Sequence, residues 1–134
     1  MQNKKIIILE DDKVNNDFLK KALSEFFTVQ GYYDGKSGLE AIYSEKPDLV
    51  LLDLMMPGIN GFDVLKDIKE KAPEILERII IVSNSSENNF VATALEYNVT
   101  SFVVKGDYDL VDIVEIVKKK LNIMDTNRTD SKKL

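Results

Sequence analysis

Four short apolar runs in this chain each end at a residue type that can handle a metal-bound phosphate. The runs occupy residues 6–9, 49–52, 79–82 and 102–104, and the residues that follow them are Glu10 with Asp11, Asp53, Ser83 and Lys105. If the runs are parallel strands of one sheet, their carboxyl ends lie along one edge, where open α/β sheets bind ligands. Carboxylates, a hydroxyl and an ammonium group then share one crevice. Those groups suit a divalent cation and a phosphoryl group.

Two adjacent carboxylates follow the first run. Glu10 and Asp11 repel each other at the end of a buried strand unless a cation lies between them. Their oxygen ligands suit Mg²⁺, with Mn²⁺ as the alternative ion. Asp12 is the third acid in a row, but we interpret it as the N-cap of a helix that begins at Lys13.

Asp53 ends a wholly apolar run, where an unpaired carboxylate costs free energy. One alternative is a buried ion pair between Asp53 and Lys105 that carries out no chemistry. Such a pair needs a single acid, whereas this edge offers three, so the sequence favours a metal site. Ser83 on its own fits a helix cap or a strand-end hydroxyl, and Phe102 on its own fits the core.

The composition limits the chemistry further. The chain has 134 residues and a formal net charge of -5, which predicts one domain and argues against direct binding to nucleic acid. Cys and His are both absent, which excludes disulfides, thiol nucleophiles and a phosphohistidine carried by this chain. The first apolar run is too short for a secretory signal, and no stretch is long enough to cross a bilayer. We therefore expect a cytoplasmic protein without membrane insertion.

Helical patterns separate the apolar runs. Helices are expected at residues 13–26, 36–43, 62–71, 87–97 and 110–121, and a weaker edge strand at 28–32. A strand followed by a helix, five times over, predicts an α/β fold with a doubly wound, five-stranded parallel sheet and five helices. Flavodoxin-like sheets of this kind commonly have the strand order 2-1-3-4-5, which puts the first and third strands side by side. Glu10, Asp11 and Asp53 would then meet.

The apolar stripes also predict where the domain ends. The expected apolar face of the first helix contains Val14, Phe18, Leu19, Ala22, Leu23 and Phe26. In the last helix the stripe stops at Leu121, and the residues beyond it have no periodicity and little to bury. We therefore predict a domain at residues 1–123 and a disordered tail at 124–134.

A turn follows Asp53. The segment at 53–62 contains Pro57, Gly58 and Gly61. Proline fixes φ, and glycine permits backbone angles that other residues avoid. Such a loop can direct a main-chain carbonyl toward a metal ion while Asp53 faces solvent.

Together these features resemble the receiver domain of two-component response regulators, in its stand-alone, single-domain form. The resemblance extends from about Lys4 to Leu121. The motifs that carry it are Ile-Leu-Glu-Asp-Asp at 8–12, Pro-Asp-Leu-Val-Leu-Leu-Asp-Leu-Met-Met-Pro-Gly-Ile-Asn-Gly at 47–61, Ser83, and Phe-Val-Val-Lys at 102–105.

The resemblance implies that Asp53 is the phosphoacceptor in a two-component system or phosphorelay. The implied Mg²⁺ site consists of Asp53, Asp11 as a direct ligand, Glu10 acting through water, and the backbone carbonyl of Met55. The implied surroundings of the phosphoryl group are Lys105 as its ion-pair partner, Ser83 as a hydrogen-bond donor, and Phe102 as the aromatic that turns inward in the active state.

The resemblance also implies partners. Because the chain has no histidine, a histidine kinase or a histidine phosphotransfer protein would supply the phosphoryl group. Phosphorylation of Asp53 would shift the surface formed by the expected helix at 87–97, the strand at 102–104 and the helix at 110–121. That surface would bind a downstream protein target. The chain would assist its own phosphorylation and dephosphorylation without being an enzyme.

Two positions, Gly106 and Asn84, depart from the family pattern, and a third, Met55, bears on the lifetime of the phosphoryl group. Gly106 stands where the family usually has proline, so the loop is less constrained and its peptide bond is not committed to the cis form. Asn84 stands where many members have a small residue, and it could narrow the path of a phosphodonor or form a hydrogen bond near the phosphoryl group. Met55, two residues after the phosphoacceptor, is apolar. We hypothesise that no side chain there orients a hydrolytic water, which predicts a long-lived aspartyl phosphate.

Three other functions share some of these features. A Mg²⁺-dependent phosphohydrolase with an aspartate nucleophile generally has a second Asp two residues later, where this chain has Met55. A flavodoxin-like electron carrier has the same sheet, but Glu10, Asp11 and Asp12 would repel its phosphate group. A receiver-like binding module that acts without phosphorylation is the main alternative, because two loop positions depart from the family pattern.

Overall fold

The structure, a computed structural model, describes residues 3–83 and 88–133, with side chains at 3–83 and 91–122. Its strands are β1 (Lys5–Leu9), β2 (Thr28–Tyr32), β3 (Leu49–Leu52), β4 (Ile79–Ser83) and β5 (Ser101–Val104). All neighbouring strands are parallel, and their order in the sheet is β2-β1-β3-β4-β5. The predicted α/β fold and strand order are therefore confirmed.

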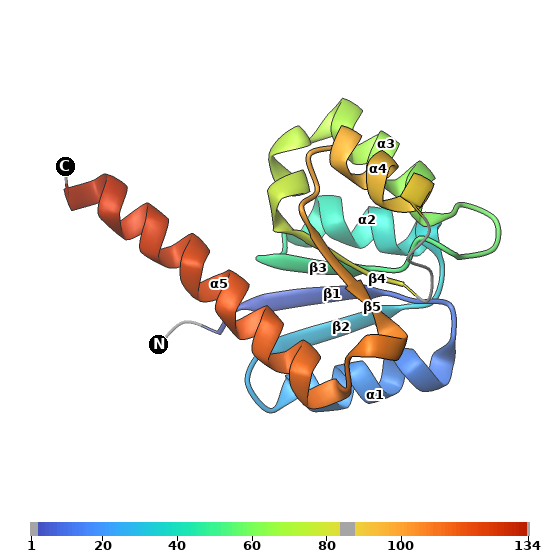
Figure 1. The fold of residues 1–134 in the computed structure, drawn as a ribbon, viewed down its shortest axis with the longest axis horizontal. Coiled ribbons are helices and arrows are strands. Elements are labelled where there is room, and N and C mark those ends of the chain that lie inside the picture. The colour runs from blue at the N-terminus through green and yellow to red at the C-terminus, as the bar shows by residue number, and fades with distance from the viewer. Residues whose placement is uncertain (1–2, 84–87, 134) are drawn as a thin grey trace.

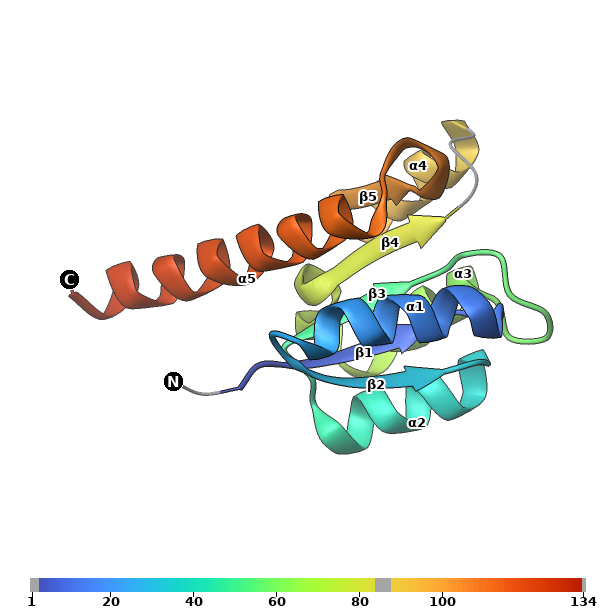
Figure 2. The same ribbon diagram turned by 90° about the horizontal axis from the view of Figure 1, so that it is seen from below.

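Helices cover both faces of this sheet (Figure 1). They are α1 (Lys13–Ser24), α2 (Gly35–Glu45), α3 (Gly61–Lys71), α4 (Asn88–Glu96) and α5 (Leu110–Lys133), with short 3₁₀ helices at Pro73–Arg78 and Lys105–Asp107. α1 and α5 pack on one face, and α2, α3 and α4 pack on the other. Figure 2 shows the molecule from the side of α1 and α5.

The strands form two cores because their side chains are apolar on both faces of the sheet. Ile6 and Ile8 of β1 pack with α1 and α5, whereas Ile7 and Leu9 pack with α2 and α3. All four side chains are at most 1% exposed. β2 lies at the edge and buries only Val29, which agrees with its mixed sequence. Because all neighbouring strands are parallel, their carboxyl ends lie along one edge of the sheet.

The apolar face of α1 is wider than the surface that the helix buries. Leu19 and Leu23 are 5% and 0% exposed, but Val14, Phe18 and Phe26, which follows the helix, are 62%, 55% and 45% exposed. The predicted apolar face is therefore wrong for this second row. Leu19 and Leu23 pack against the sheet, whereas Phe18 and Phe26 line grooves between α1 and α5. Apolar surface consequently remains exposed on this side of the molecule.

α5 is longer than the sequence predicts. Its packing on the core ends at Leu121, as expected, yet its helical backbone continues to Lys133. Residues 124–133 are thus helical in the structure, in contrast to the predicted disordered tail, because no proline or glycine follows Leu121 to end the helix. In Figure 1 this last part projects beyond the sheet. No helix in the described ranges combines the length and hydrophobicity that a bilayer crossing requires.

Candidate phosphoryl and metal site

The predicted site residues lie at the carboxyl edge of the sheet, and the backbone holds two of them in place. The N–H of Asp53 donates to the carbonyl of Leu9 at 2.9 Å, and the N–H of Glu10 donates to the carbonyl of Tyr32 at 3.1 Å. These hydrogen bonds extend the pairing of neighbouring strands by one residue. Backbone pairing with neighbouring strands thus positions Glu10 and Asp53 independently of any side-chain contact.

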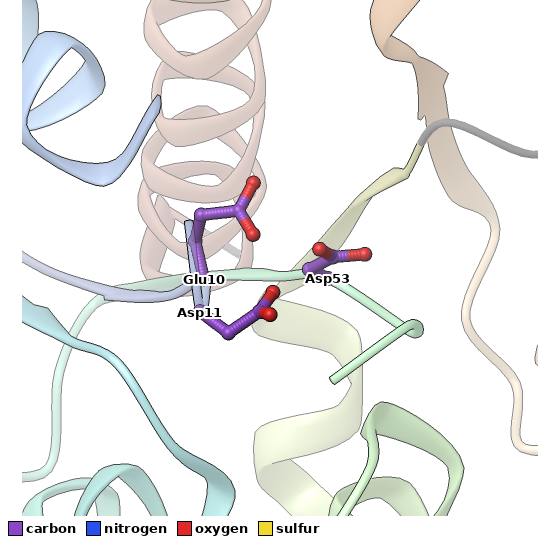
Figure 3. Close-up of side chains that lie close together, drawn as sticks. All are labelled: Glu10, Asp11 and Asp53. Atoms are coloured by element: carbon purple, nitrogen blue, oxygen red, sulfur yellow. The ribbon is translucent and has the colours of Figure 1, made fainter. Parts of the chain in front are cut away.

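Three carboxylates lie together at this edge (Figure 3). One oxygen from each of Glu10, Asp11 and Asp53 lies within 4.8 Å of the others. Glu10 and Asp53 are 2% and 6% exposed, and Asp11 is half-buried. The next acid, Asp12, is the predicted N-cap of α1, and its side chain accepts hydrogen bonds from backbone N–H groups of the first turn. The predicted grouping of the other three is confirmed, and their mutual repulsion calls for positive charge.

Lys105 supplies part of that charge. Its Nζ pairs with Oε1 of Glu10 and lies 3.5 Å from Oδ2 of Asp53. The Lys105 side chain is 14% exposed, so water screens these contacts only weakly. A simple Asp53–Lys105 ion pair does not describe the arrangement, because two acids share the ammonium group and Asp11 lies beside them. One ammonium leaves the three carboxylates with negative charge in excess.

The pKa of Glu10 reflects its burial first and the neighbouring negative charge second. Burial raises the pKa of Glu10 to about 7, and Asp53 adds to the rise while Lys105 opposes it. Because the ionised form of Glu10 is disfavoured, binding of a further cation would recover free energy. All the side-chain donors are carboxylate oxygens, the set that Mg²⁺ prefers in proteins. Glu10, Asp11 and Asp53 therefore fit a Mg²⁺ ion.

The loop after β3 fixes the orientation of the Asp53 side chain. The N–H of Met55 donates to Oδ1 of Asp53 at 3.0 Å, and the other oxygen, Oδ2, faces Lys105. Further along the loop, Gly58 has a φ of 71°, a left-handed angle that glycine adopts without strain. The backbone carbonyl of Met55 as a metal ligand stays a prediction.

Comparison with known proteins identifies the family. Residues 6–118 match the model of the response regulator receiver domain. The chain belongs to this family. Among curated proteins, the response regulator ArlR of Staphylococcus saprophyticus is 33% identical over 118 residues, which make up 87% of this chain and 52% of that protein. The receiver thus spans about half the length of the ArlR proteins that it matches.

Solved structures share the receiver fold. The CheY-like response regulator receiver domain protein of Methanospirillum hungatei matches 94% of this chain and 99% of its own, with a TM-score of 0.84 and 23% identity. The BeF3-activated receiver domain of DrrB matches 90% of this chain and 99% of its own, with a TM-score of 0.78 and 25% identity. Receiver domains bind Mg²⁺ at an acidic pocket, and the three clustered carboxylates form such a pocket here.

Two further predicted site residues lie on β4 and β5. Ser83 ends β4 and is fully buried, and its Oγ has no hydrogen-bond partner within the described part of the chain. A buried hydroxyl without a partner costs free energy, so Ser83 suits an acceptor that arrives from outside. Phe102 of β5 is half-buried against the core on the side of α2, α3 and α4. Its inward turn stays a prediction.

The departures from the receiver pattern have different outcomes. The described peptide bonds are all trans, including the one between Lys105 and Gly106. A side chain at Gly106 would meet open space. Asn84, which could narrow the path of a phosphodonor or form a hydrogen bond near the phosphoryl group, lies outside the described residues.

Sequence reasoning missed one buried polar residue of this site. Asn16 of α1 is fully buried, and its Nδ2 donates to the backbone carbonyls of Glu10 at 3.0 Å and Tyr32 at 2.9 Å. The helical spacing of Asn16 could have predicted its burial. Asn16 precedes Leu19 by three residues and Leu23 by seven, so all three share the buried face of the helix.

Proposed function

We propose that this receiver is a phosphoacceptor switch of a two-component system or phosphorelay. The observation that supports the proposal is the pairing of one ammonium, on Lys105, with both Glu10 and Asp53 inside a cluster of three carboxylates. Phosphoryl transfer needs an aligned nucleophile and positive charge around the transferred group. Mg²⁺, when held by Glu10, Asp11 and Asp53, supplies the part of that charge that Lys105 does not.

Asp53 is the proposed nucleophile. A carboxylate oxygen of Asp53 attacks the phosphorus of a phosphohistidine, so that an O–P bond forms while the P–N bond breaks. The electron pair of the broken bond returns to the imidazole nitrogen of the donor. The hydrogen bond from Met55 N–H holds the carboxylate, which aligns the attacking group before the donor arrives.

Lys105 and Ser83 then respond to the transferred group. Lys105 exchanges the Asp53 carboxylate for the phosphoryl oxygens, and the unpartnered hydroxyl of Ser83 donates to one of them. Both contacts draw the ends of β4 and β5 toward Asp53, and the surface of α4, β5 and α5 shifts as a result. This surface is the proposed binding site for a downstream protein.

The proposed donor is a histidine kinase or a histidine phosphotransfer protein, because the chain has no histidine. Its proposed docking surface covers α1 and the start of α5, where Val14, Phe18, Tyr108 and Val111 are between 43% and 69% exposed. A cavity of ≈ 320 Å³ opens between Phe18 and Lys105. Apolar surface beside a reactive site marks a protein partner, and Lys105 connects this cavity to Asp53.

The direct test is chemical phosphorylation followed by intact mass. We expect the wild-type chain to gain one phosphoryl group from acetyl phosphate in the presence of Mg²⁺ and none in the presence of a chelator. Asp53→Asn should gain none. Asp12→Asn is the matched control, because asparagine caps a helix as well as aspartate does, and it should gain one. No adduct on the wild type, or an adduct that survives Asp53→Asn, would overturn the proposal.

We also propose that the aspartyl phosphate is hydrolysed slowly and that the chain does not turn over phosphomonoesters. Met55 is 56% exposed and apolar, so its side chain offers no group that could orient a hydrolytic water beside Asp53. We expect Met55→Asn to shorten the half-life of the adduct several-fold, because an amide can position water. An unchanged half-life would remove Met55 from the account. Continuous release of phosphate from a phosphomonoester would make the chain an enzyme instead.

A further inference from the structure

We propose that Asn16 is a positioning residue of the metal site, because it anchors the peptide group that joins Glu10 to Asp11. The inference rests on the proposed function, in which these two acids help to hold the cation. Asn16 is fully buried within α1. An amide inside a helix costs free energy unless it is hydrogen-bonded, and an aliphatic side chain would suit the face shared with Leu19 and Leu23 better. A polar residue here therefore needs a specific reason.

The hydrogen bonds of Asn16 join three elements. Nδ2 donates to the carbonyl of Glu10, just after β1, and to the carbonyl of Tyr32, at the end of β2. The carbonyl of Tyr32 also accepts the N–H of Glu10. Both partners of Nδ2 are acceptors, so a reversed amide would set Oδ1 against two carbonyl oxygens. The orientation of the Asn16 side chain is thereby determined.

The carbonyl of Glu10 is the group through which Asn16 acts on the metal site. Because a peptide group is planar, the C=O of Glu10 and the N–H of Asp11 rotate together. A hydrogen bond that fixes this carbonyl therefore fixes the direction in which the backbone carries Asp11 away from Glu10. Both carboxylates converge with Asp53 to within 4.8 Å. Rotation of the peptide group would separate them.

Gly31 of β2 makes room for this side chain. A Cβ atom added at Gly31 would lie 2.2 Å from Oδ1 of Asn16, which is closer than atoms that are not bonded can approach. The φ of Gly31 lies outside the left-handed region, so the backbone does not require glycine there. Glycine also weakens a strand. Space for the Asn16 amide is thus the physical reason for glycine at this position.

Mg²⁺ affinity tests the inference without phosphorylation. In an NMR titration of backbone amides with Mg²⁺, we expect Asn16→Ala to weaken binding about tenfold, a usual effect of losing an outer-shell hydrogen bond. Val117→Ala is the matched control. Val117 is fully buried in the core of α1 and α5, so its truncation lowers stability without touching Glu10 or Asp11. Wild-type affinity in Asn16→Ala, or an equal loss in both variants, would overturn the inference.

Gly31→Ala gives a second test that retains Asn16, and it decides the matter if Asn16→Ala does not fold. Its added methyl group should displace the amide and weaken Mg²⁺ binding, whereas in an Asn16→Ala background it should have little further effect. Additive losses of affinity, or none, would overturn the pairing. A wild-type chain that fails to bind Mg²⁺ would overturn the proposed function itself, which separates the two failures.

Discussion

The two halves of the receiver site differ in how completely the resting protein satisfies them. At β1 and β3, Glu10 and Asp53 have backbone hydrogen bonds to neighbouring strands, and both side chains pair with Lys105. At the ends of β4 and β5, the Oγ of Ser83 has no hydrogen-bond partner among the described residues. The carboxylates of the acid half, Glu10 and Asp53, are thus paired at rest, whereas the hydroxyl of Ser83 in the other half, called the reporting half, is not.

This difference indicates how one small group could couple the two halves. In the proposed function, a phosphoryl group on Asp53 would bring negative charge, which would attract Lys105 away from Glu10, and acceptor oxygens, which would satisfy the hydroxyl of Ser83. Acceptance of the phosphoryl group would therefore depend on charges that are already in place. Transmission of the signal to the surface of α4, β5 and α5 would depend on contacts that form only afterwards. Substitutions in the two halves should accordingly act on different measurements.

Lys105→Met should have the largest effect on stability, because it removes the only cation paired with the acid half among the described residues. Breaking a buried ion pair costs about 3 kcal/mol, so we expect the free energy of unfolding to fall by about that amount without Mg²⁺. Saturating Mg²⁺ should recover most of the loss, since the ion neutralises the same carboxylates. Urea unfolding with and without Mg²⁺ measures both values.

The control for this substitution is Lys71→Met. Lys71 pairs with Asp67 at the surface, at 3.2 Å and with 63% of its own side chain exposed, and exposed pairs contribute little to stability. We expect a small loss that Mg²⁺ does not change. If Mg²⁺ stabilised Lys105→Met no more than the wild type, the ammonium and the metal would not share a site.

Glu10 should make the stability of the acid half depend on pH. Burial raises the pKa of Glu10 in the folded state to about 7, above its ordinary value of 4.5. Between these values the folded state retains a proton that the unfolded state has lost, so the free energy of unfolding falls as pH rises through this window. Saturating Mg²⁺ should suppress the fall, because the cation favours ionised Glu10. Urea unfolding across the window tests this, and the same fall in Glu10→Gln would contradict it.

Ser83→Ala should separate transmission from acceptance. Removing a buried hydroxyl that has no partner should raise the free energy of unfolding by about 1 kcal/mol, while the adduct on Asp53 still forms. NMR shifts in α4, β5 and α5 on phosphorylation should shrink. Ser101→Ala is the matched control, because Ser101 Oγ accepts a hydrogen bond from Lys120 at 2.8 Å and its loss should lower stability. Destabilisation by Ser83→Ala would show that this hydroxyl has a partner at rest.

The same contrast explains how much of the molecule the sequence could predict. Continuous apolar runs identified β3 at its observed bounds and β1, β4 and β5 to within one residue, because strands buried on both faces leave no other pattern. The grouping of Glu10, Asp11 and Asp53 followed from strand order alone. The strand positions and the grouping of residues at the strand ends were thus predictable from the sequence.

The sequence pattern could not predict which of several neighbours a side chain contacts. Lys105 pairs with Glu10 as well as Asp53, which depends on the path of a long side chain across two strands. The sequence predicted one apolar face of α1 that included both rows, but Val14 and Phe18 are exposed in the structure. The inward amide of Asn16 required the space beside Gly31, on a different element. Each of these depends on tertiary neighbours that periodicity does not specify.

The smallest effect should come from two glycines, one in each half of the site. An added Cβ would meet nothing within 4 Å at Gly58 or at Gly106, but only Gly58 has a positive φ, 71°. Gly106→Ala should raise the free energy of unfolding by about 0.5 kcal/mol, because it restricts the unfolded chain. Gly58→Ala should lower it by about 1 kcal/mol, because alanine is strained in the left-handed region. Urea unfolding of both variants decides this, and adduct formation in Gly106→Ala should match the wild type. A stability loss in Gly106→Ala would mean that the loop after β5 requires the backbone freedom of glycine, as the loop after β3 does at Gly58.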